Sequence, residues 1–184
     1  MNLEWIKSGI SPLTDLISFL NKKSQTNDVL KKRLLVELRD NLNIFKNGFL
    51  NKTSHDKVID LLSNEAIQES IKGNFSFKKL KSGHVLTSHI RDERNRRYVG
   101  WTAEQLIDKI DEKILELRNI KKLNGGSTKD VKNNIPLMMS NLYFRLKLLA
   151  EFIRSKWILL SMSSSSNRER KFVLIRVISG QNRN

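Results

Sequence analysis

The feature that most constrains the fold is a repeat of apolar residues at helical spacing. Between Val29 and Phe49 such residues recur every three or four positions, giving one apolar stripe along about five helical turns. The stripe consists of Leu30, Leu34, Leu38, Leu42, Phe45 and Phe49. Burying each of these side chains is worth about 1.5–3 kcal/mol, so the pattern predicts a long helix packed against other helices.

Three other segments show the same helical spacing of apolar residues. Residues 3–20 show apolar residues at helical spacing, and Ser11 as a cap with Pro12 at the first helical position indicates that a new helix begins there. Residues 58–71 predict a weaker helix or a pair of short helices, with Ser63 as an internal cap. A final long helix begins near Pro136. Its predicted inner face consists of Met138, Leu142, Leu146, Leu149, Ile153 and Trp157.

The clearest helix boundaries enclose residues 102–124. Thr102 and Gln105 match the S/T-x-x-E/Q capping box, in which each side chain pairs with the other residue's backbone N–H. The sequence Asn124-Gly125-Gly126 then supplies a left-handed stop. Trp101 stands just before the cap, where a hydrophobic staple packs onto the core.

These segments predict a mainly α fold, an antiparallel bundle of four to five helices. We expect the bundle to occupy residues 1–162, with a basic insertion at 73–100 that is either a loop or a small β-hairpin. Residues 163–184 form a basic tail containing Ser and Arg, in which "FVLIRVISG" predicts a strand. Such a strand needs a pairing partner, because exposed it would promote aggregation.

Positive charge is unevenly distributed along the chain. The formal net charge is +15, from 34 basic and 19 acidic residues. Residues 1–70 hold 10 basic and 9 acidic residues, whereas residues 71–100 hold 8 and 2. Segregated charge of this kind favours an anionic partner.

We therefore predict an anion-binding surface, with nucleic acid as its main candidate ligand. Arginine side chains pair with phosphate oxygens, and Tyr98 could stack on an unpaired base. The candidate residues are Lys78, Lys79, Lys81, Arg91, Arg94, Arg96, Arg97, Tyr98, Arg168, Arg170 and Lys171. The alternative is a solvated loop in which the arginines pair with nearby acids while Tyr98 and Trp101 pack on the core.

Catalytic patterns are lacking in the sequence. There are no cysteines, which excludes disulfides and thiolate sites, and no P-loop, nucleophile-elbow or zinc-protease motif occurs. His84 and His89 stand five residues apart near Asp92 and Glu93, a poor spacing for a shared metal. We expect no cofactor and no metal, and favour a protein that is not an enzyme.

The expected setting is the bacterial cytoplasm, since no apolar run reaches the ~20 residues that span a bilayer. The polar face of the first helix carries too few lysines for an interfacial membrane helix. Partners would be nucleic acid or an acidic protein surface, with a homo-oligomer formed through the C-terminal segment as a further candidate. The alternative function is a protein-interaction or regulatory module, as in toxin–antitoxin or defence assemblies.

Overall fold

The computed structural model describes residues 10–155, which are mainly helical, as predicted. By its contacts the chain divides into residues 1–153 and residues 154–184, and the fold described below is that of the first unit. The named helices are α1 (Ile10–Lys23), α2 (Val29–Leu50), α3 (His55–Leu61), α4 (Glu65–Lys72) and α5 (Ala103–Leu123). A last helix is described over residues 135–155. Trp157, the 163–184 tail and its predicted strand lie outside the described residues.

Helices α1 and α2 pack against each other across a short connection. The side chain of Asp28 caps α2 by accepting a hydrogen bond from the Lys31 N–H at 3.1 Å. The predicted stripe of α2 is confirmed: its four middle residues are buried, and Leu30 and Phe49 pack partly buried against the same core. The predicted apolar positions of α1 from Leu13 onward are likewise buried or half-buried.

Helices α3 and α4 are the predicted pair of short helices. Ser63 accepts a hydrogen bond from the Glu65 N–H at 3.3 Å, but the N-cap residue of α4 is Asn64, which makes no side-chain capping bond. The capping side chain comes instead from α2, where the Glu37 carboxylate accepts hydrogen bonds from the N–H groups of Ala66 at 2.8 Å and Ile67 at 3.2 Å. This long-range cap ties α2 to α4, which the two helices' sequences do not predict.

Helix α5 begins and ends as predicted. Thr102 accepts from the Gln105 N–H at 3.3 Å, and the Gln105 side chain accepts from the Thr102 N–H at 2.8 Å. After Asn124, Gly125 and Gly126 adopt φ angles of +66° and +85°, a region that favours glycine. Among the described helices, none has the length and apolar content that crossing a bilayer would require.

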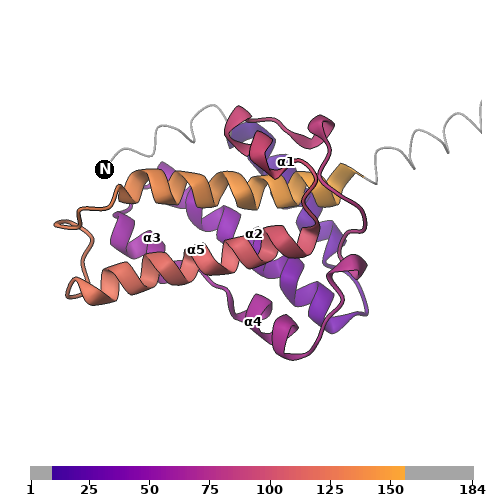
Figure 1. The fold of residues 1–184 in the computed structure, drawn as a ribbon, viewed down its shortest axis with the longest axis horizontal. Helices are drawn as coiled ribbons and strands as arrows, with labels where there is room; N and C mark the ends of the chain where they lie inside the picture. Colours follow the sequence, from indigo (N-terminus) through magenta and orange to yellow (C-terminus); the bar gives the residue numbers. More distant parts are fainter. Residues whose placement is uncertain (1–9, 156–184) are drawn as a thin grey trace, which may run out of the picture. The chain divides into compact units, whose positions relative to one another are not determined.

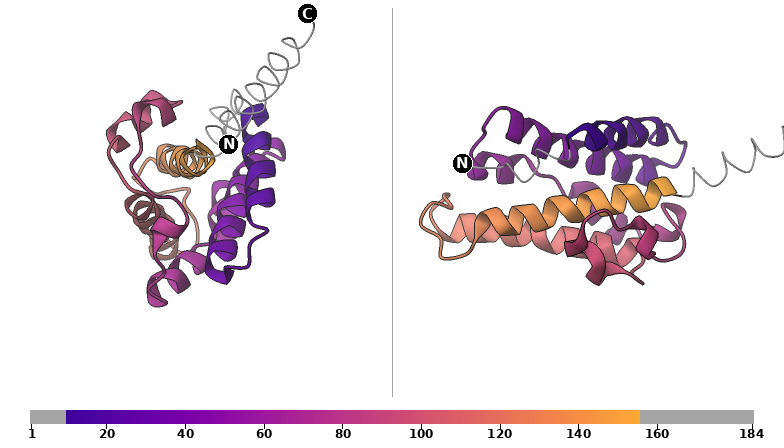
Figure 2. Two further views of the ribbon diagram at one scale, coloured as in Figure 1. Left: turned by 90° about the vertical axis from the view of Figure 1, so that its right-hand side faces the viewer. Right: turned by 90° about the horizontal axis from the view of Figure 1, so that it is seen from above.

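The last helix is the central element of this unit. Asn134 caps it by accepting from the Leu137 N–H at 3.0 Å. The predicted inner face is buried from Leu142 to Ile153, with Met138 partly buried, but so is most of the opposite face, including Phe144, Leu148 and Phe152. Figures 1 and 2 show why: α1 and α2 lie on one side of this helix, and the connection between α4 and α5 covers another side.

That connection, residues 73–100, was predicted to be either a loop or a small β-hairpin, and it is a loop. It contains the short 3₁₀ helices η2 (Phe77–Lys79), η3 (Thr87–His89) and η4 (Glu93–Tyr98), and none of its residues is in a strand. Phe75, Phe77, Leu80 and Val85 are buried in the core. These apolar side chains therefore anchor an irregular chain and do not build a hairpin. Val85, in the middle of the connection, makes two backbone hydrogen bonds of 2.8 Å with its end: its N–H donates to residue 101 and its carbonyl accepts from residue 100.

Candidate functional site

The arginine-rich turn η4 is fixed to the last helix by side-chain contacts. Arg94 donates from Nη1 to the Ser140 hydroxyl at 2.8 Å, and its guanidinium carbon lies 4.3 Å from the centroid of the Phe144 ring. Its Nε lies 3.0 Å from the carboxylate of Asp92. Asn95, which is buried, donates to the Phe144 carbonyl at 2.9 Å. Arg94 thus holds the turn in place, which competes with its predicted role as a phosphate ligand.

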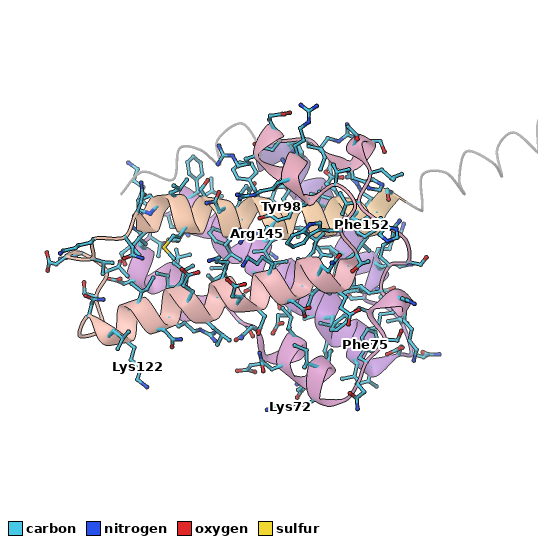
Figure 3. The ribbon with its side chains drawn as sticks, in the orientation of Figure 1. Lys72, Phe75, Tyr98, Lys122, Arg145 and Phe152 are labelled. Carbon is cyan, nitrogen blue, oxygen red and sulfur yellow. The ribbon has the colours of Figure 1, made fainter. Side chains whose placement is uncertain are left out.

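Tyr98 is 3% exposed, so its ring cannot stack on a base as predicted. The ring packs edge-on against Trp101 with centroids 4.9 Å apart, and its hydroxyl accepts a hydrogen bond from Nε of Arg145 on the last helix. Figure 3 shows Tyr98 and Arg145 together where the connection covers this helix. The alternative prediction, that Tyr98 and Trp101 pack on the core, agrees with this placement. We therefore remove Tyr98 from the candidate interface.

Two predicted residues are exposed but paired with acids. Arg96 donates to the Glu93 carboxylate at 2.8 Å, and this bond raises the pKa of Arg96, so that it stays charged. Lys79 lies 4.0 Å from the carboxylate of Asp28. Exposed pairs of this kind contribute only about 0–1 kcal/mol, so a polyanion could compete for either cation.

Three predicted residues, Lys78, Arg91 and Arg97, are exposed and have no carboxylate within ion-pair distance in the part of the chain that the structure describes. The Arg97 guanidinium carbon lies over the Tyr98 ring, 5.1 Å from its centroid. These three side chains are the cations best placed to meet an anion from solvent. We call Lys78, Arg91 and Arg97 the exposed basic set.

Lys81 is half-buried and lies over Phe152 of the last helix, with Nζ 5.1 Å from the ring centroid. Lys79, in contrast, lies over Phe75, at 5.8 Å. Figure 3 shows Phe75 and Phe152 well apart, the first beside α2 and α4 and the second on the last helix. The basic residues of the connection therefore form two groups and not one continuous cluster. Arg168, Arg170 and Lys171 lie outside the described residues.

Arg145 is the residue that the sequence analysis missed. It is 4% exposed, and its buried Nη1 has no hydrogen-bond partner within the described chain. Its position offered a signal, because it follows Leu142 by three residues and precedes Leu149 by four, on the apolar side of the helix. A charged residue at such a position needs a polar partner from another element, and Tyr98 is that partner.

The histidines do not form a metal site among the residues described. Nδ1 of His89 accepts a hydrogen bond from the Leu86 N–H at 2.8 Å, which occupies that nitrogen. His84 is exposed. No group of three metal-ligating side chains comes together within the described range.

An internal cavity lies between α2, α4, α5 and the last helix. Its volume is about 20 Å³, and Glu37 and Asn41 are its polar lining residues. A space of this size holds about one water molecule, which is too small for a cofactor or substrate.

Comparisons of the chain with protein-family models, with curated proteins and with solved structures find no match.

Proposed function

We propose that this protein binds nucleic acid through its phosphate groups, largely without sequence specificity. The observation that carries the proposal is the exposed basic set: Lys78, Arg91 and Arg97 belong to one connection, although its basic residues fall into two groups, and none of the three has a described carboxylate within ion-pair distance. Phosphate contacts position a nucleic acid without reading its sequence. The helices of the connection are 3₁₀ helices of three to six residues, unlike the α-helices that enter the major groove to read base edges.

The way the connection is held supports this role. Flexible lysines and arginines lose side-chain entropy on binding, and a fixed backbone reduces the remaining cost of ordering. Here the backbone is anchored by Asn95 and Arg94 on the last helix and by the buried residues Phe77 and Val85. The exposed basic set therefore extends from a well-anchored support.

The test is the salt dependence of oligonucleotide binding, measured by fluorescence anisotropy. Each phosphate contact contributes about −0.7 (single strand) to −0.9 (duplex) to the slope of log K against log salt concentration. Replacing the exposed basic set by glutamine should weaken binding and make the slope shallower by about 2–3. The matched control removes three exposed lysines of other elements, Lys22, Lys52 and Lys132. Equal effects of the two variants, or a flat salt response of the unmodified protein, would refute the proposal.

A protein partner with an acidic surface is the second candidate. It is favoured by two apolar side chains of the same connection that remain exposed, Leu86 at 57% and Val99 at 41%. They flank the backbone pair between Val85 and Gly100, close to the arginines. Replacing both with serine should leave oligonucleotide affinity unchanged. Loss of a stoichiometric co-purifying protein in that variant, with no nucleic acid retained by the unmodified protein, would favour the second candidate.

A further inference from the structure

Two groups that can bind an anion, His89 and Lys81, lie against Phe152, and a third, Arg91, is close to His89 in the chain. The His89 ring lies 5.1 Å from the Phe152 ring, and Lys81 Nζ lies 5.1 Å from the same ring, centroid distances in both cases. Arg91 follows His89 by two residues and is exposed. Figure 3 places Phe152 on the last helix where the connection passes over it, and the positive charges of Lys81 and Arg91 both act on His89.

The orientation of His89 is set by its hydrogen bond. Because Nδ1 accepts the Leu86 N–H, the proton of the neutral ring is assigned to Nε2. Nε2–H is then a donor, and no described group accepts from it. Adding a second proton would have to occur at Nδ1 and would break the bond to Leu86.

The electrostatic surroundings of His89 disfavour its positively charged form. Burial lowers the pKa of His89, and the positive charges of Lys81 and Arg91 lower it further. The residue of the last helix that packs on His89 is the uncharged Phe152, preceded in that helix by the buried Glu151. Two cations that disfavour a third positive charge will favour a negative one at the same place.

We infer that Lys81, His89 and Arg91 bind one phosphate group, with His89 donating from Nε2 while Lys81 and Arg91 supply the positive charge. This inference rests on the proposed function for the source of the phosphate, a phosphodiester of the nucleic acid. The shared chemistry is that of a phosphate oxygen, which a free phosphate compound also offers. Charge-assisted hydrogen bonds of this type are among the stronger polar contacts.

The experiment follows the Nε2 resonance of His89 by ¹⁵N NMR in the full chain, during titration with an oligonucleotide and, separately, with inorganic phosphate. The key variant is His89→Asn. Its side-chain oxygen can still accept from Leu86, but the donor at the Nε2 position is lost. His84→Asn is the matched control, because His84 is an exposed histidine of the same connection. Arg91→Gln, an exposed position, is the second variant should His89→Asn fail to fold.

The expected result is a shift of the His89 Nε2 resonance on adding oligonucleotide. His89→Asn and Arg91→Gln should each weaken oligonucleotide affinity about tenfold, the loss of one charge-assisted hydrogen bond. His84→Asn should bind as the unmodified protein does. Oligonucleotide binding with no shift at His89 and no loss in either variant would overturn the site and leave the proposed function standing.

The two sources of phosphate are separated by the second titration. If inorganic phosphate shifts His89 but the oligonucleotide does not bind, the site stands and the proposed nucleic-acid function fails. If neither ligand shifts His89 and neither binds, both proposals are overturned.

Discussion

Removing the hydroxyl of Tyr98 should destabilise the protein by more than the loss of an ordinary hydrogen bond. This hydroxyl accepts from Nε of Arg145, a guanidinium that is 4% exposed and whose buried Nη1 has no partner within the described chain. A hydrogen bond to a charged group contributes about 1.5–3 kcal/mol. Tyr98→Phe keeps the ring and its contact with Trp101 but leaves the buried charge without this bond, so we expect a loss of about 2–3 kcal/mol.

A double-mutant cycle tests the cause of that loss. Arg145→Met removes the buried charge and keeps a long apolar side chain, and such replacements are often nearly neutral. Tyr98→Phe combined with Arg145→Met should therefore be more stable than Tyr98→Phe alone, with a coupling energy of about 1.5–3 kcal/mol. Urea unfolding followed by circular dichroism measures all four proteins. Additive effects, or a Tyr98→Phe loss below about 0.5 kcal/mol, would show that the two side chains do not form the pair described here.

Three further predictions concern stability and are measured by the same urea unfolding. Glu37→Ala should cost about 3–4 kcal/mol, because it removes the acceptor for the buried N–H groups that start α4. The control Glu65→Ala, in the exposed first turn of α4, should cost only about 0.5 kcal/mol. Equal losses in the two variants would contradict the long-range cap. Thr102→Ala should cost about 1 kcal/mol through the capping box of α5, and an unchanged midpoint would count against that cap. Burial is the main cause of the lowered pKa values of His55 and His89, so near the pKa of histidine the unfolded chain binds more protons than the folded one. The stability that these histidines contribute should therefore be fully present above about pH 6.5 and be lost as the pH falls below it. In His89→Asn this loss should be less steep. A pH slope unchanged by His89→Asn would exclude a contribution from His89.

Much of the fold could be predicted from the sequence because local interactions set it. The stripe of α2 and the capping box of α5 depend on residues three or four positions apart, and these contacts form inside one helix. Two short helices over residues 58–71 were one of two predicted alternatives, and the structure forms them as α3 and α4, with Asn64 and not Ser63 as the N-cap residue of α4. The last helix was predicted with one buried face, but it is buried on most sides, because the 73–100 connection folds over it.

The candidate site could be predicted from the sequence only in part. Lys78, Arg91 and Arg97 are exposed, as the charge pattern of the segment predicts. Arg94 belongs to the same charge pattern and Tyr98 to the same segment, but their side chains hold the connection on the last helix. Their partners, Ser140 and Arg145, lie about fifty residues away in the chain. No local spacing reveals such a partner.

The sequence by itself determined the helices, their ends and the segment that carries the excess positive charge, since periodicity, capping and charge are properties of neighbouring residues. Only the tertiary structure decided which of those charges face solvent. It did so by packing the connection on the last helix, where burial of apolar side chains and the need to satisfy buried polar groups draw some residues inward and leave others exposed.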